Sequence, residues 1–144
     1  MAILTNIRQA LKVQLATIAG LNTFAQIPDS FVVPAALVGI VPSGTPIVEY
    51  DANFAGAKIG KPGATWHLLI RVYLGKVMTI DAQKSLDDFI DPTGSKSVKY
   101  AIESNRTLSG ACDDLRVTQA QGYAQYDIGG VKYLGIEFAV DVYT

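Results

Sequence analysis

The chain of 144 residues has a formal net charge of −1, only 17% charged residues and a mean hydropathy of +0.25. This length predicts a single domain over residues 1–144, and the near-zero charge gives no basic field to attract nucleic acid or a membrane surface. The longest apolar run, residues 31–41, is interrupted by Pro34 and is shorter than the roughly 20 residues of a membrane helix, and a lone Cys112 excludes an intrachain disulfide.

The first part of the chain predicts a helix followed by strands. From Leu4 to Ile18, apolar residues recur every three or four positions, which is the spacing of one helix face, and Gly20 is a typical helix end. Two later prolines favour an extended path, and glycines after Asp51 favour a loop. We therefore expect a helix over residues 2–19, strands over residues 35–41 and 46–50, and a loop over residues 51–63.

The rest of the chain predicts a strand, then helices, then a hairpin. Apolar residues alternate from Trp66 to Leu74, which is typical of a strand with one buried face. After Met78 the spacing of the apolar residues becomes helical. Further along, the Gly129-Gly130 pair is a strong hairpin signal, because both residues can adopt positive φ. We expect a strand over residues 65–77, helices over 80–90 and 97–105, strand segments over 115–121 and 123–128, and a last strand over 131–143.

The order of these elements, α-β-β-β-α-α-β-β, keeps helices and strands in separate blocks. This order predicts an α+β fold, in which the helices pack on one face of an antiparallel sheet. The last strand should direct one set of apolar side chains into the core: Leu134, Ile136, Phe138, Val140 and Val142.

The reactive side chains do not form a catalytic or metal-binding pattern. His67, the only histidine, lies on the more polar face of its predicted strand, where a structural role is the more ordinary one. Cys112 is followed by two aspartates, whose negative charge opposes thiolate formation. Asp87 and Asp88 lie about 100° apart around a helix, so they do not converge on one substrate atom. We therefore expect no enzyme, and no catalytic, metal-binding or cofactor-binding residues.

The shortage of charge is the best indication of function. Residues 30–48 contain no charged side chain, and only three of the first 48 residues are charged. A domain of this size has too little core to bury so much apolar surface, so we expect burial against other protein chains. Candidate subunit-interface residues come from the uncharged segment and from the tyrosines of the later strands, where tyrosine favours protein contacts: Phe31, Val33, Leu37, Tyr73, Tyr123 and Tyr126.

Several segments that together cover nearly the whole chain have a familiar pattern. They are IPDSFVVPAALVGIVPSGTPIVEYD, WHLLIRVYLGK, LDDFIDPTGSKSVKYAIESN, DDLRV and GGVKYLGIEFAVDVY. The pattern resembles the small tail-terminator, or tail-completion, proteins of long-tailed bacteriophages, particularly those of actinobacterial phages. The resemblance implies an α+β fold, no catalytic residues, and a homohexameric ring that caps the tail tube, stops its polymerisation and provides the surface on which the DNA-filled head docks.

The resemblance also implies where the protein acts and with which partners. These are further copies of the chain, the tail-tube protein, and head-connector or neck proteins, while genomic DNA only passes through the ring lumen. We expect no cofactor and no membrane contact. The expected location is the tail–neck region of the virion, after assembly in the host cytoplasm.

The loop over residues 51–63 is the candidate contact with the tail tube or with an adjacent subunit. It is longer than the ~2–5 residues of an ordinary hairpin connection, and its glycines would let it fit a partner. Phe54 and Ile59 are apolar groups that a solvated loop does not need, and Lys58 and Lys61 add positive charge.

Two other functions remain open from the sequence. One is another neck protein of the same virion, such as a head-closure, stopper or connector subunit. The other, from a different class, is a small-molecule binder or an enzyme whose site consists mainly of backbone groups. A ring on tails favours the terminator, a ring on tail-less filled heads favours the neck protein, and a monomer with a ligand favours the binder.

Overall fold

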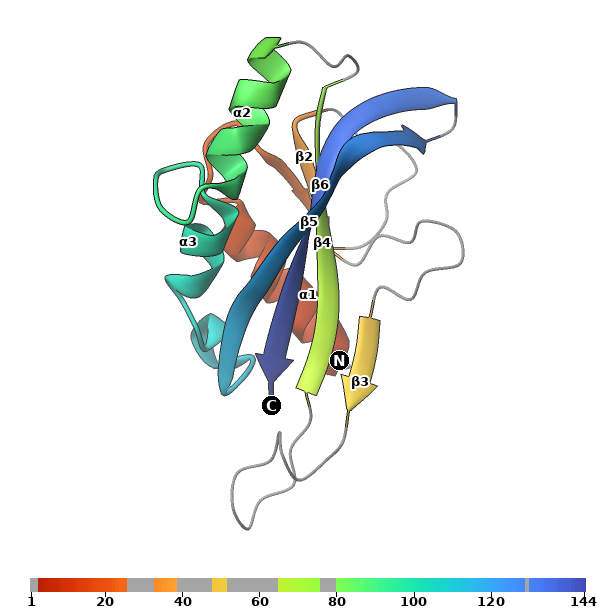
Figure 1. The fold of residues 1–144 in the computed structure, drawn as a ribbon. Coiled ribbons are helices and arrows are strands. Elements are labelled where there is room, and N and C mark those ends of the chain that lie inside the picture. The colour runs from red at the N-terminus through yellow and green to blue at the C-terminus, as the bar shows by residue number, and fades with distance from the viewer. Residues whose placement is uncertain (1–2, 26–32, 39–47, 52–64, 76–79, 129) are drawn as a thin grey trace.

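The computed structural model describes residues 3–25, 33–38, 48–51, 65–75, 80–128 and 130–144. Within these ranges the chain forms one sheet with helices packed on one face, which confirms the predicted α+β class (Figure 1). The helices are α1 (Ile3–Leu15), α2 (Ile80–Ile90), α3 (Val98–Glu103) and a short 3-10 helix, η1 (Leu108–Gly110). The strands are β1 (Asn22–Phe24), β2 (Ala35–Val38), β3 (Val48–Asp51), β4 (Thr65–Gly75), β5 (Asp114–Ile128) and β6 (Val131–Tyr143).

Strand β4 is the centre of the sheet. The strand order is β1-β2-β4-β6-β5, and β3 pairs with the part of β4 that β2 leaves free. Strands β4 and β6 are antiparallel, with Leu68 opposite Val140 and Arg71 opposite Glu137. Strand β6 is also antiparallel to β5, which lies at one edge of the sheet. The pairing of β4 with β6 therefore joins the two halves of the sheet.

The structure corrects the predicted strands in two places. Strand β1, which the sequence did not predict, pairs in parallel with β2, so the sheet is mixed rather than wholly antiparallel. Its three residues are too few to show a period, and its pairing includes a 3.0 Å hydrogen bond from Asn22 N to the carbonyl of Pro34. The predicted segments 115–121 and 123–128 form one strand, β5, which continues past Gly122 through a shift in register.

The ends of several predicted elements also differ. Helix α1 ends at Leu15, and turns rather than a helix lead from there to Gly20, where φ is +79°. The predicted strand residues 39–41, 46–47 and 76–77 lie outside the described residues, as does the predicted loop after Asp51.

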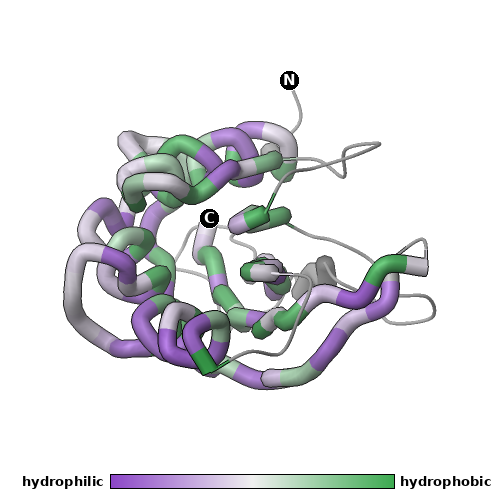
Figure 2. The backbone as a smooth tube through the Cα atoms, turned by 90° about the horizontal axis from the view of Figure 1, so that it is seen from above, coloured by the Kyte–Doolittle hydropathy of each residue, from purple (hydrophilic) through white to green (hydrophobic). Residues whose placement is uncertain are grey.

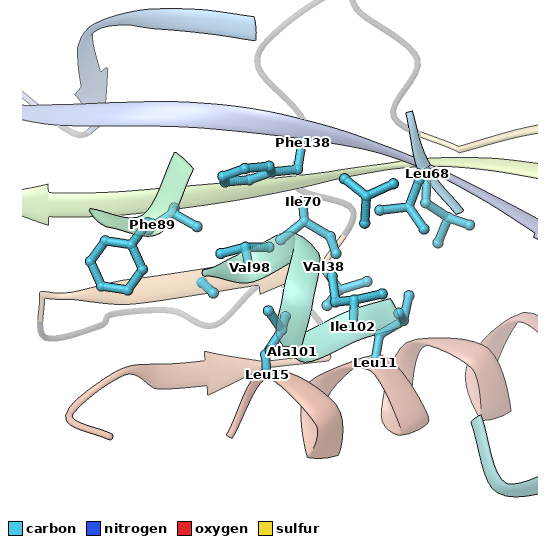
Figure 3. Close-up of a cluster of buried hydrophobic side chains, with 14 of the residues drawn as sticks. Leu11, Leu15, Val38, Leu68, Ile70, Phe89, Val98, Ala101, Ile102 and Phe138 are labelled. Carbon is cyan, nitrogen blue, oxygen red and sulfur yellow. The ribbon is translucent and has the colours of Figure 1, made fainter. Parts of the chain in front are cut away.

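The helix-side face of the sheet carries the main hydrophobic core. Ile70 of β4 and Phe138 of β6 are at most 1% exposed on this face, and α1 and α3 cover them with side chains such as Leu11 and Ile102 (Figure 3). Each large apolar side chain buried in this way stabilises the fold by about 1.5–3 kcal/mol. The predicted inward set of β6 is confirmed, since all five members are buried in this core: Leu134, Ile136, Phe138, Val140 and Val142.

The opposite face, which we call the outer face, has a different composition. Seen from above, the helices gather on one side of the sheet and the β5–β6 hairpin extends away from them (Figure 2). A second, smaller apolar cluster lies on the outer face, built from Ala35, Leu37 and Tyr73. Partly buried residues pack against it: Phe24, Val33, Tyr126 and Tyr133.

Val140→Asp is expected to lower the free energy of unfolding by about 3–5 kcal/mol, because it places an unpaired carboxylate in the core. Val131→Asp is the matched control, since Val131 lies on the same strand but is 37% exposed, and it should cost less than about 1 kcal/mol. Urea unfolding of both variants measures the difference. Equal losses would contradict the assignment of Val140 to the core.

Candidate functional site

The residues predicted to form a subunit interface do not share one exposed surface. Leu37 is 1% exposed and Tyr73 is 0% exposed, because both lie inside the second cluster. Neither side chain is available to a partner on the folded subunit, which corrects the prediction for these two residues. Val33 and Tyr126 are partly buried against the same cluster, whereas Tyr123 is 39% exposed. The remaining predicted contact residues lie outside the described ranges: Phe31, Phe54, Lys58, Ile59 and Lys61.

The outer face carries an ion pair between a buried arginine and a partly buried glutamate, which the sequence did not predict. Arg71 is 2% exposed, and its Nη2 donates to Oε1 of Glu137, which lies directly opposite on β6. Its Nη1 donates to the hydroxyl of Tyr73 at 3.1 Å. The guanidinium carbon also lies 4.1 Å from the ring centre of Tyr126, which is a cation–π contact. Side chains from β4, β5 and β6 therefore meet at one guanidinium, and we call these four residues the Arg71 cluster.

Arg71 and Tyr126 keep their protons near neutral pH. Burial alone lowers the pKa of Arg71, but the hydrogen bonds to Tyr73 and Glu137 outweigh burial, so its pKa is raised. Burial, followed by the negative charge of Glu137, raises the pKa of Tyr126 to about 12. Arg71 is therefore a cation and Tyr126 a neutral phenol at pH 7, which suits a fixed contact better than proton transfer.

Two glycines leave the space that the Tyr126 side chain occupies. A Cβ at Gly135 would lie 2.9 Å from the carbonyl oxygen of Val72 and 3.0 Å from the Tyr126 ring, so the ring occupies the space that a side chain would need. Gly122 has a φ of +69°, and its carbonyl accepts a hydrogen bond from the Tyr126 hydroxyl. A side chain at either position would displace Tyr126 from the guanidinium.

His67 takes part in a second cross-strand pair on the outer face. Its Nδ1 lies 2.7 Å from Oδ1 of Asp141, the residue directly opposite on β6. The two side chains are 36% and 24% exposed. This pair joins the same two strands as Arg71 and Glu137, so it gives His67 a structural contact of the kind that the sequence analysis expected.

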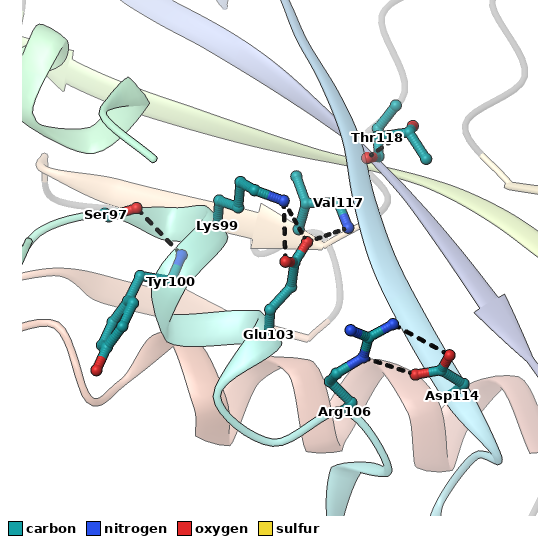
Figure 4. Close-up of polar contacts among 9 residues, drawn as sticks. Ser97, Lys99, Tyr100, Glu103, Arg106, Asp114, Val117 and Thr118 are labelled. Carbon is teal, nitrogen blue, oxygen red and sulfur yellow. Dashed lines mark hydrogen bonds and ion pairs between the residues drawn. The ribbon is translucent and has the colours of Figure 1, made fainter. Parts of the chain in front are cut away.

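Side chains of α3 and the segment after it brace the first part of the edge strand β5 (Figure 4). The Glu103 carboxylate accepts hydrogen bonds from the backbone nitrogen of Val117 at 3.0 Å and from Lys99 Nζ at 2.7 Å. Arg106 pairs with Asp114 at 2.9 Å. Burial opposes ionisation of Glu103, but the hydrogen bonds from Lys99 and Val117 outweigh it, so the pKa of Glu103 is lowered. The edge of β5 at Val117 is therefore already occupied.

Cys112 is placed in an environment that suppresses its reactivity. Burial, followed by the charges of Asp114 and Asp113, raises the pKa of its thiol to about 11. Its Sγ lies 3.4 Å from the carbonyl oxygen of Arg106. The thiol is therefore protonated at neutral pH, which weighs against a nucleophilic role.

The described residues offer neither a group of metal ligands nor a membrane-spanning helix. Among the described residues, no group of three or more His, Cys, Asp or Glu side chains is placed to hold a metal ion. No helix within those ranges is long and apolar enough to cross a membrane.

An open hollow of about 390 Å³ lies between the turn after α1, strand β4 and helix α2. Leu74 and Phe89 contribute apolar wall, and Asp81 and Lys96 contribute opposite charges. This combination could hold a small amphipathic molecule, and it is the feature that favours the small-molecule alternative.

The comparisons with known proteins assign no family. No protein-family model matches the chain, and no curated protein sequence matches it. The resemblance to tail-terminator proteins therefore stays a prediction.

Glu103→Gln is expected to lower the free energy of unfolding by about 1 kcal/mol at pH 7, because it removes the ion pair with Lys99 and weakens the bond from Val117. The folded state lowers the pKa of Glu103 below its ordinary 4.5, so the stabilisation is fully present above pH 4.5 and is lost as the pH falls through the folded-state value.

The difference between Glu103→Gln and the wild type should therefore shrink toward zero as the pH falls below the lowered folded-state pKa of Glu103. Urea unfolding at several pH values measures it, with Asp88→Asn on the exposed side of α2 as the control. A difference that stays constant across this pH range would contradict the assigned role of the Glu103 carboxylate.

Proposed function

We propose that this chain is the structural subunit of a ring that caps the tail tube of a long-tailed bacteriophage, stops its polymerisation and provides the head-docking surface. The observation that carries this proposal is the edge strand β5. Residues 117–126 contain no charged side chain, and residues 118–125 are exposed or partly exposed. An edge strand presents backbone N–H and C=O groups that can pair with a strand of another chain. This edge therefore supports a role in assembly.

The edge of β5 is protected against such pairing mainly in its first part, before Ala124. Natural edge strands are usually blocked by charged side chains, prolines or bulges. In β5, Glu103 occupies the edge at Val117. The register of β5 with β6 shifts just before Gln119 and again just after Gln121, and each shift interrupts the regular row of backbone groups along the edge. Beyond Gln121 the strand continues to Ile128 with Asp127 as its one charged residue. The occupant that we propose is a second copy of this chain.

A closed ring also needs a second, different surface on each subunit, because its contacts run head to tail. We assign that second surface to the opposite edge of the sheet, which is formed by β1 next to β2. No charged residue occurs from Val13 to Pro28, a segment that includes β1. Residues 117–126 of β5 and the segment around β1 therefore lack the charges that would keep two copies apart.

The proposed partners follow from this assembly. The ring, a homohexamer, would meet the tail-tube protein on one side and head-connector or neck proteins on the other, within the virion. Genomic DNA would pass through the lumen without being bound, which suits a subunit whose net charge is −1. Residues 51–63 are the proposed contact with the tube.

Two alternatives predict different outcomes. A head-closure, stopper or connector subunit would use the same edge but would be found on filled heads that lack tails. A small-molecule binder is favoured only by the hollow next to α2, and it would remain a monomer with ligand bound.

The combined variant Gln119→Lys/Gln125→Lys tests the role of the edge, since both side chains are exposed on β5. It should lose ring formation in light scattering, alone and with tail tubes, because two lysine charges would have to be buried against the uncharged β1 edge of the next copy. Its melting temperature should change little, as surface substitutions usually cost within about 0.5 kcal/mol each. The control is Tyr100→Lys on α3, which is 59% exposed and belongs to neither proposed ring surface.

A wild-type chain that stays monomeric even when tube ends are present would overturn the proposed ring. A wild-type ring together with normal assembly of the lysine variant would instead show that β5 is not the interface.

A further inference from the structure

The end of the β5–β6 hairpin extends beyond the described part of the central strand β4. Among the described residues, the last pair of β4 and β6 is Gly75 with Leu134, whereas β5 and β6 continue to the pair Ile128 with Val131. Figure 1 shows this end of the hairpin curving away from the helices. A two-stranded hairpin is only marginally stable by itself. Residues 125–128 and 131–133, which we call the distal hairpin, therefore depend on other contacts to hold one orientation.

Tyrosine rings tie the distal hairpin to the central strand. The ring of Tyr126 is 5.9 Å from that of Tyr73, centre to centre, in an edge-to-face arrangement. The ring of Tyr133 is 5.6 Å from that of Tyr73. Since Tyr73 belongs to β4, these contacts hold both strands of the distal hairpin against the outer face.

Arg71 is the charged centre of the same contacts. Its Nη1 and Nη2 donate to Tyr73 and Glu137, and its buried Nε has no hydrogen-bond partner among the described residues. The ring of Tyr126 lies against the guanidinium at 4.1 Å. A cation removed from water gains more from an aromatic face than an exposed cation does. The contact between Arg71 and Tyr126 is therefore a strong attachment for an otherwise marginal hairpin.

Tyr123 provides an internal comparison on the same strand. It lies three residues before Tyr126 and is 39% exposed. Its hydroxyl donates to the carbonyl of Gln83 on α2 at 3.4 Å, which is a long hydrogen bond at the surface. Loss of the Tyr123 side chain removes similar aromatic area but leaves the Arg71 cluster intact.

We propose that Arg71 is a clamp that holds the distal hairpin on the outer face, and that the hairpin opens as a separate unit when the clamp is removed. The helix-side core stays folded in the open state. The clamp thereby sets the direction in which the end of the β5 edge points. It does not depend on the proposed ring, because every contact lies within one subunit.

Hydrogen–deuterium exchange of the full chain tests the clamp, with Tyr126→Leu compared to Tyr123→Leu. Tyr126→Leu should accelerate exchange of distal-hairpin amides by at least about tenfold, because local opening sets their protection. Core amides such as those of Ile70 and Val140 should keep their wild-type rates. Tyr123→Leu should change exchange in the distal hairpin by less than about threefold.

Arg71→Met is the second variant, and it should accelerate the same amides as Tyr126→Leu. If Arg71→Met does not fold, the two tyrosine variants decide the question. Equal exchange in the distal hairpin of the two tyrosine variants would overturn the clamp. Acceleration of the core and the hairpin together by Tyr126→Leu would also overturn it, because the hairpin would then not open separately.

Discussion

The rest of the structure depends on the register in which β4 pairs with β6. That register places Ile70 opposite Phe138 on the helix side and Arg71 opposite Glu137 on the outer face. Successive side chains of a strand point to opposite faces, so a shift of one residue would expose the apolar set and turn the charged set toward the core. Hydrophobic burial on one face and a buried ion pair on the other therefore specify the same register.

The two faces contribute in different ways. The helix-side core supplies most of the stability through apolar burial. A buried ion pair adds little net stability, because the loss of hydration offsets much of the attraction between the charges. We therefore infer that the Arg71 cluster orients the β5–β6 hairpin. It brings together side chains of three strands, and the absence of a side chain at Gly135 leaves room for the ring of Tyr126. The orientation of the hairpin in turn decides how the β5 edge is presented, which links the outer face to the proposed assembly.

The sequence predicted those parts that follow from a local period. The alternation along β6 and the helical spacing in α1 predicted about a third of the main core, because each pattern lies within one element. The burial of Tyr73 could not be predicted, since alternation shows that it faces away from Ile70 but not that the hairpin covers it. The pairing of Arg71 with Glu137 depends on a register between strands 66 residues apart that no short turn specifies. Opposite charges at outward positions of β4 and β6 were the one signal in the sequence for this pairing. Strand β1 was too short to show any periodic signal.

A double-mutant cycle between Arg71 and Glu137 tests most directly whether the ion pair on the outer face forms in the register that the helix-side core specifies. Arg71→Met, Glu137→Gln and the double variant are unfolded in urea, and the coupling free energy is calculated from the three losses. A coupling of at least about 1 kcal/mol is expected, because a buried arginine pairs with a partly buried glutamate on the opposed strand. Losses that simply add, with a coupling below about 0.3 kcal/mol, would contradict the register of β4 and β6 and with it the Arg71 cluster.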